Sequence, residues 1–139
     1  MFTKILFAYD GSEHSKRAAR ISGNLTRMQD NAELWLVCVM GATPKHLKQP
    51  HIQEFHDNQK KAAKTFFKEA RNLIGNDIII HDELLFGPPA LNILDVAKKN
   101  KIELIIMGAR GLNVLQGLLL GSQVHRVISL SKCPVLVVK

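Results

Sequence analysis

The sequence is poor in the residues that crosslink small folds or bind metals. Its two cysteines, Cys38 and Cys133, lie far apart and form no C-x-x-C motif. This excludes a disulfide-rich scaffold and a cysteine-ligated zinc site, and both thiols are expected to be buried and unreactive. The six histidines show no metal-ligand spacing either, so we predict no protein-ligated metal site.

Long hydrophobic runs are also missing. The longest, such as residues 34–40, are far shorter than the roughly 20 residues that a membrane-spanning helix needs. The first residues lack the succession of basic, apolar and small residues that marks a secretion signal. We therefore expect a cytoplasmic protein that makes no contact with membranes.

Acidic and aromatic residues are scarce at the C-terminal end. Residues 98–139 hold seven of the 19 Lys and Arg residues but one of the 12 Asp and Glu residues. Such an excess is either a solvated basic face or an attraction for a polyanion such as a nucleotide or a nucleic acid. No aromatic residue follows Phe86, so the stacking that single-stranded nucleic acid requires is absent and nucleic acid is disfavoured as a partner.

The length of 139 residues, 46% of them apolar, is typical of one globular domain spanning residues 1–139. Short apolar runs alternate with stretches of helical spacing, which predicts five strands and four helices. The expected strands are residues 5–9, 34–40, 78–85, 102–107 and 134–139. The expected helices are residues 12–28, 51–74, 88–99 and 121–131. Gly75 is expected to end the second helix in a left-handed conformation. Ala62 and Ile128 are assigned to the buried stripes of their helices.

Near-continuous apolar strands separated by helices are typical of a parallel sheet that is covered on both faces. The sequence therefore predicts a doubly wound α/β fold. In such sheets the ligand lies at the carboxyl ends of the strands, where the winding reverses. Residues that directly follow strands are thus candidates for binding: Asp10, Val39, Met40, Gly87, Met107 and Gly108.

The segment after the fourth strand offers two places for a phosphate group. Gly108 and Gly111 can adopt positive φ and turn successive amides inward as an anion nest. Gly121 and Ser122 open the last helix, whose first amides are unpaired and whose dipole is positive there. Glycines also occur in ordinary turns, so a purely structural loop remains the alternative.

This segment differs from two familiar phosphate-binding motifs. It contains neither a Walker G-x-x-x-x-G-K-[ST] motif nor a dinucleotide-binding G-x-G-x-x-G motif. The usual phosphate-binding lysine is absent, and Arg110 could replace it by pairing with a phosphate. Solvation of Arg110 at the surface is the alternative interpretation.

The spacing resembles the nucleotide-binding pattern of the universal stress protein family, G-x2-G-x9-G-[ST], at Gly108, Gly111, Gly121 and Ser122. The resemblance extends along the whole chain. It includes the opening residues 5–12, the turn at residues 87–90, residues 104–108 and the closing residues 133–138. Four short motifs in the right order make a chance similarity improbable.

The resemblance implies a five-stranded parallel sheet of order 3-2-1-4-5, helices on both faces, and a fold like that of the adenine nucleotide alpha hydrolases. It also implies a dimer and bound ATP. An exposed apolar edge strand at residues 134–138 would invite uncontrolled pairing, so we expect the homodimer to form through this last strand. By resemblance, Ala8, Asp10 and Val39 would contact the nucleoside, and Met107 and Gly108 the ribose and α-phosphate. Gly111, Gly121, Ser122 and the amides of Gln123 and Val124 would hold the phosphates, with Arg110 as a further candidate. Gln123 departs from the family, in which many relatives have a small or apolar residue there. Its side chain matters little if the backbone amide binds the phosphate, but it could crowd the terminal phosphate if it turns inward.

Asp10 has two interpretations. Its carboxylate could bind the ligand, directly or through Mg²⁺, or it could only accept hydrogen bonds from the amides of Ser12 or Glu13. The sequence offers no pair of residues to activate water for phosphoryl transfer. We therefore expect an ATP-binding stress-response module with no catalytic residues, in which segments 41–50 and 111–121 are the parts that rearrange. A slow ATPase or a nucleotidyl-transferring enzyme on the same fold is the alternative.

Overall fold

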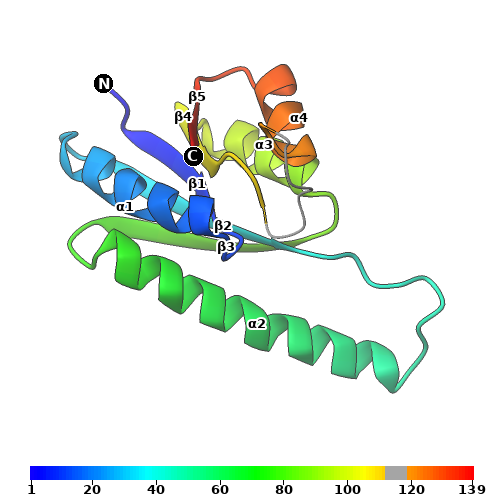
Figure 1. Cartoon of the computed structure of the whole chain (residues 1–139). Coiled ribbons are helices and arrows are strands. Elements are labelled where there is room, and N and C mark those ends of the chain that lie inside the picture. Colours follow the sequence, from blue (N-terminus) through cyan, green and yellow to red (C-terminus); the bar gives the residue numbers. More distant parts are fainter. Residues whose placement is uncertain (112–118) are drawn as a thin grey trace.

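The described part of the protein forms one parallel five-stranded sheet flanked by four helices (Figure 1). The computed structural model describes residues 1–111 and 119–139. The strands are β1 (Lys4–Ala8), β2 (Glu33–Met40), β3 (Ile79–Phe86), β4 (Leu104–Gly108) and β5 (Val135–Val138). The helices are α1 (Glu13–Arg27), α2 (His51–Ile74), α3 (Pro89–Asn100) and α4 (Ser122–Leu130). The predicted elements are all present, with ends that differ by a residue or two.

The strand order is β3-β2-β1-β4-β5, and all neighbouring strands are parallel. Strand β1 is central, and its Ile5 pairs with Leu34 of β2 on one side and with Leu104 of β4 on the other. The chain builds outward from β1 to β3 and then continues at β4 on the other side of β1. The predicted doubly wound fold and strand order are confirmed.

Each face of the sheet has its own apolar core. Helices α1 and α2 cover one face of the sheet, and α3 and α4 cover the other (Figure 1). Side chains alternate along a strand, so Ile5 and Phe7 pack against α1 and α2, whereas Leu6 packs against α3 and α4. Ala18 of α1 packs in the first core and Val127 of α4 in the second. The continuous apolar runs of the strands therefore follow from burial on both sides.

Four details of the expected packing are wrong. Gly75 has φ 103° and ψ 168°, which is not the left-handed helical conformation. In α2 the buried position is Ala63 rather than Ala62, and in α4 Ile128 is 43% exposed. Cys133 is only half-buried, whereas Cys38 is fully buried, and burial raises the pKa of the Cys38 thiol to about 12. The errors at Ala62 and Ile128 arise because helical periodicity defines a stripe of residues but not its centre.

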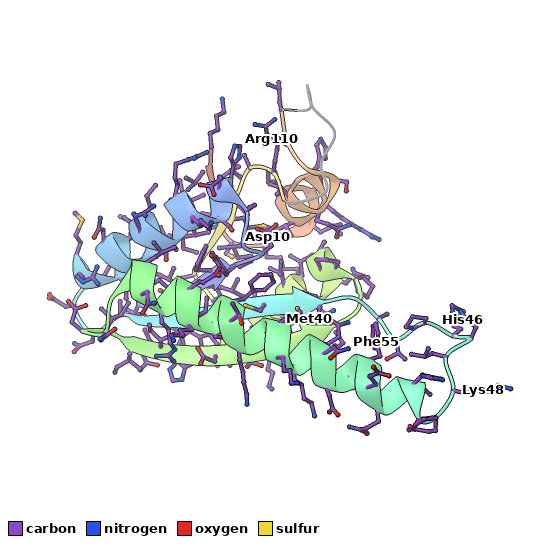
Figure 2. All side chains as sticks on the ribbon, turned by 60° about the horizontal axis from the view of Figure 1, so that its bottom comes forward. Asp10, Met40, His46, Lys48, Phe55 and Arg110 are labelled. Carbon is purple, nitrogen blue, oxygen red and sulfur yellow. The ribbon has the colours of Figure 1, made fainter. Side chains whose placement is uncertain are left out.

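The N-terminal half of α2 extends beyond the sheet. Figure 2 shows the chain running outward after Met40, past His46 and Lys48, and returning as α2 at Phe55. The start of this segment contacts the helix, because Gln59 donates a hydrogen bond to the Gly41 carbonyl at 2.9 Å. Of the second segment predicted to rearrange, residues 112–118 lie outside the described residues. Within the described part of the chain, no helix has the length and apolar character needed to span a membrane.

Candidate functional site

A cavity of about 270 Å³ lies at the carboxyl ends of the central strands. It opens where the sheet reverses its direction of winding, between β1 and β4, as expected for this type of sheet. The cavity brings together the residues that the family resemblance assigns to the site: Ala8, Asp10, Val39, Met107, Gly108, Arg110, Gly111, Gly121, Ser122, Gln123 and Val124. Met40 and Gly87, which were candidates because they follow strands, are not among its lining residues. Contact of these residues with a ligand remains a prediction.

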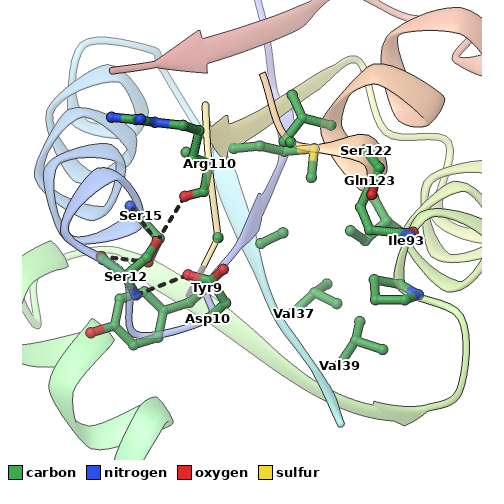
Figure 3. Close-up of a pocket in the computed structure, with 17 residues that line it drawn as sticks. Tyr9, Asp10, Ser12, Ser15, Val37, Val39, Ile93, Arg110, Ser122 and Gln123 are labelled. Atoms are coloured by element: carbon green, nitrogen blue, oxygen red, sulfur yellow. Dashed lines mark hydrogen bonds between the residues drawn. The ribbon is translucent and has the colours of Figure 1, made fainter. Parts of the chain in front are cut away.

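Six further residues line the cavity that the sequence did not single out: Tyr9, Ser12, Ser15, Val37, Pro89 and Ile93. Two of them had a signal in the sequence. Val37 lies two residues before Val39 and so shares its face of β2, and Ile93 belongs to the buried stripe of α3. Val37 and Ile93 are almost fully buried, so one end of the cavity has an apolar wall (Figure 3).

The other end of the cavity is formed by the first turn of α4. Gly121 is the N-cap, with an extended backbone (φ −68°, ψ 154°), and no described side chain caps the helix. The amide of Gly121 itself donates to the carbonyl oxygen of Ala109 at 2.8 Å. The amides of Ser122, Gln123 and Val124 have no acceptor within the helix, and all three residues line the cavity. These amides and the positive end of the helix dipole favour an anion.

The glycines of the 108–111 turn are needed for close packing rather than for an unusual backbone. Neither Gly108 nor Gly111 has a positive φ, so the expected anion nest is wrong. A Cβ on Gly108 would lie 2.7 Å from the amide nitrogen of Ser15, in the first turn of α1. A Cβ on Gly111 would lie 2.6 Å from Oδ2 of Asp10. Glycine at these positions therefore allows the turn to sit directly against the start of α1.

Residues between β1 and α1 contact the 108–111 turn and hold it in place. Asp10 Oδ1 accepts a hydrogen bond from the Ser12 amide at 2.9 Å, while Oδ2 lies beside Gly111. Ser12 caps α1 by accepting from the Ser15 amide at 3.2 Å, and its hydroxyl donates to the Arg110 carbonyl oxygen at 3.2 Å. The local hydrogen bond expected of Asp10 is thus present, and Asp10 also borders the cavity (Figure 3).

The side chain of Gln123 contacts α3 and not the first turn of its own helix, α4. Its Oε1 accepts a hydrogen bond from the Ala90 amide at 3.0 Å. Since Pro88 provides no side-chain cap for α3, Gln123 supplies that cap from the neighbouring helix. The Gln123 side chain therefore has a structural role between the two helices.

Metal ligation has little support in the described residues. No group of three or more His, Cys, Asp or Glu side chains there is arranged to hold a metal ion. Asp10 is the one acidic residue among the described cavity residues. An ion at this site would therefore depend on ligand oxygens for most of its coordination.

The fold and the cavity define a class of protein: a doubly wound α/β domain with a ligand cavity at the reversal of its sheet and a helix N-terminus suited to an anion. The chain belongs to the universal stress protein family, whose sequence model matches residues 1–139. It is similar to the universal stress protein encoded beside the QAH/OAS sulfhydrylase gene of Thermus aquaticus, with 39% identity over 140 residues, covering 100% of both chains.

Solved structures of the family share the fold. The universal stress protein UspA from Lactobacillus plantarum has a TM-score of 0.88 at 25% identity, over 99% of this chain and 98% of its own. A universal stress protein in complex with cAMP has a TM-score of 0.71 at 23% identity, over 99% and 97% of the two chains. The Archaeoglobus fulgidus protein in complex with dAMP has a TM-score of 0.62 at 19% identity, over 100% and 98%.

Proposed function

We propose that the cavity binds an adenine nucleotide, with ATP as the ligand, and that the protein is a nucleotide-dependent stress-response module. The observation that carries this proposal is the first turn of α4. There the amides of Ser122, Gln123 and Val124 border the cavity without a described side-chain cap. Backbone amides at a helix N-terminus can bind phosphate without a lysine.

The apolar end of the cavity suits the nucleoside. Val37, Ile93 and Met107 provide apolar contacts for a base, and Val39, at the end of β2, offers main-chain groups to its edge. Asp10 is placed to accept a hydrogen bond from a ribose hydroxyl or to bind Mg²⁺ bridging the phosphates. Two related proteins were solved with cAMP and dAMP, which supports an adenine nucleotide as the ligand.

Hydrolysis is expected to be slow or absent. In-line attack on a phosphate needs a positioned water and a group to orient it. Asp10, the acidic residue among the described cavity residues, already accepts the Ser12 amide with one oxygen. ATP would then act because its binding changes the protein surface next to the site, and not because it is hydrolysed.

The experiment is calorimetric titration of the protein with ATP, ADP, AMP and GTP, with and without Mg²⁺. Gly121→Val should abolish binding, because its side chain would occupy the space of the phosphate oxygens, while the extended backbone at this position accepts valine. Gly41→Val is the matched control, since a Cβ there meets nothing closer than 3.9 Å. A folded Gly121→Val protein that binds ATP like the parent chain would refute the phosphate site. Many turnovers per second with ATP and Mg²⁺ would favour the enzyme alternative.

The proposal includes a homodimer through β5. This strand is at the edge of the sheet, and Val135, Leu136 and Val137 are only half-buried. An exposed apolar edge strand invites pairing with another strand. A second copy of the chain would satisfy the free backbone groups of this edge.

A further inference from the structure

A histidine and an arginine that are 96 residues apart in the sequence meet at the rim of the cavity. Nε2 of His14, in the first turn of α1, lies 3.3 Å from Nη2 of Arg110. The guanidinium group has donors only, so Nε2 must be the acceptor and His14 must be neutral, with its proton on Nδ1. Nδ1 is buried and has no hydrogen-bond partner among the described residues. The contact thus forms although it leaves a polar N–H unpaired.

This contact keeps the guanidinium away from the predicted phosphate position. Figure 3 shows the Arg110 side chain extended over α1, away from the cavity that its residue borders. Its main chain is held separately, because the Ser12 hydroxyl donates to the Arg110 carbonyl oxygen. The side chain can therefore turn toward the cavity without moving the 108–111 turn.

The charges around His14 favour its neutral form. Burial, and then the positive charges of Arg110 and Arg17, lower the pKa of His14 below its usual value. Asp10 acts in the opposite direction with a smaller effect. Arg17 is itself held in place by a hydrogen bond from Nε to the carbonyl oxygen of Lys139 at 2.6 Å. A proton on Nε2 of His14 would remove the acceptor and place a like charge beside Arg110.

Arg110 is the one cationic residue among the described residues that border the cavity. A monophosphate can be held by the α4 amides alone, whereas a second and third phosphate bring additional negative charge that favours a cation. Arg110 can meet that charge only by leaving His14.

We propose that His14 is a positioning residue that holds Arg110 away from the site and so sets how strongly the site prefers polyphosphate over monophosphate nucleotides. This inference rests on the proposed nucleotide site. In the parent chain, Arg110 must break its hydrogen bond to His14 before it can contact ATP. When the His14 acceptor is lost, Arg110 is available to ATP without that cost. The ratio of ATP to AMP affinity then rises by about 3- to 10-fold, as expected for the net contribution of one ordinary hydrogen bond.

The experiment measures this affinity ratio by calorimetry at pH 8 for four variants and the parent chain. His14→Phe should raise the ratio, whereas His14→Gln, which keeps an acceptor oxygen, should stay near the parent value. Arg110→Gln should lower the ratio. Combining His14→Phe with Arg110→Gln should give the value of Arg110→Gln alone, because His14 acts only through Arg110. Thermal melting of each variant verifies that it is folded.

A pH series separates this role from a purely structural one. As pH falls through the pKa of His14, the parent chain should lose the Arg110 contact and its ratio should rise toward that of His14→Phe. The variants His14→Phe and His14→Gln lack the titrating group, so they report the titration of the ATP phosphates alone. The difference between the parent chain and His14→Gln is the quantity of interest.

The outcomes distinguish this inference from the proposed function. If the parent chain binds neither AMP nor ATP, the nucleotide site itself is refuted. If both bind but His14→Phe leaves the ratio unchanged or lowers it, the role of His14 is refuted and the site stands. A ratio that responds to His14→Phe equally with and without Arg110 would also refute the coupling.

Discussion

The side-chain oxygen of Gln123 accepts a hydrogen bond from the backbone amide of Ala90 at 3.0 Å. Gln123 lies in the first turn of α4 and Ala90 in the first turn of α3, so this bond joins the N-termini of two helices at the wall of the cavity. The positive ends of both helix dipoles are therefore held near each other. The bond also turns the Gln123 side chain toward α3. The direction of the Gln123 backbone N–H is therefore determined only by the geometry of α4.

Gln123→Ala should lower the free energy of unfolding by about 1 kcal/mol, the usual effect of losing a helix N-cap. Gln123→Glu is the control, because a carboxylate oxygen can accept the same hydrogen bond and favours a helix N-terminus. Urea unfolding of the three proteins measures the effect. Equal stability of the alanine variant and the parent chain would mean that the bond contributes nothing to α3.

Gly108→Ala should destabilise the fold rather than only weaken ligand binding. Its Cβ would lie 2.7 Å from the Ser15 amide nitrogen and 2.9 Å from the Cβ of His14, and overpacking of this kind costs about 1–3 kcal/mol. Gly41→Ala has open space and should be nearly neutral. A Gly108→Ala protein with the parent stability but no nucleotide affinity would show that this glycine serves the ligand.

Tyr9 should titrate only at very alkaline pH. Burial, the hydrogen bond to Glu69 and the charge of that carboxylate raise the pKa of its phenol above the usual value, and its hydroxyl donates to Glu69 Oε2 at 3.0 Å. Tyr9 is the only tyrosine in the chain, so ultraviolet absorbance of tyrosinate reports it alone. Ionisation at the pH of free tyrosine in the folded protein would contradict the structure.

The raised pKa of Tyr9 also determines the sign of a stability change. Above the unfolded-state pKa, near 10, the unfolded chain loses a proton that the folded chain keeps. The free energy of unfolding should therefore fall as pH rises from that value toward the folded pKa. Tyr9→Phe should lack this pH-dependent component. Its free energy of unfolding should be lower by about 0.5–1.5 kcal/mol at neutral pH, because the hydrogen bond from the residue after β1 to Glu69 of α2 is lost. Urea unfolding at several alkaline pH values measures both effects.

Val137→Pro should disrupt a dimer formed through β5 without unfolding the subunit. The carbonyl oxygens of Pro134 and Val138 face β4, where they accept from Ile105 and Ala109. Alternation along the strand directs the backbone of Val137 toward the free edge. Proline there removes an outward N–H group, a change that edge strands tolerate.

Leu136→Pro is the contrasting variant, because the backbone of Leu136 faces β4. Proline there removes an N–H group on the β4 side, so it should destabilise the subunit itself. Light scattering coupled to size-exclusion chromatography gives the mass of each variant. A folded Val137→Pro protein that remains dimeric would place the interface elsewhere, and a monomeric parent chain would refute the dimer.

Much of the architecture could be predicted from local patterns. The apolar runs at residues 34–40 and 102–107 predicted buried parallel strands, because burial on both faces requires continuous apolar side chains. Since the carboxyl ends of parallel strands share one edge, residues that follow different strands, such as Asp10 and Gly108, could be expected in one place. The cavity residues taken from the family pattern do meet there.

What the sequence alone determined is the order of helices and strands, the sheet that they form and the edge at which a ligand would bind, because these depend on periodicity over a few residues. Only the tertiary structure decided how particular side chains are used. It showed that the first turn of α1 leaves no space for a side chain at residue 108. It also showed that Gln123 caps α3 and that His14 accepts a hydrogen bond from Arg110. Each of these contacts joins residues that are more than 30 positions apart in the sequence. Their distance in space depends on how the whole chain packs.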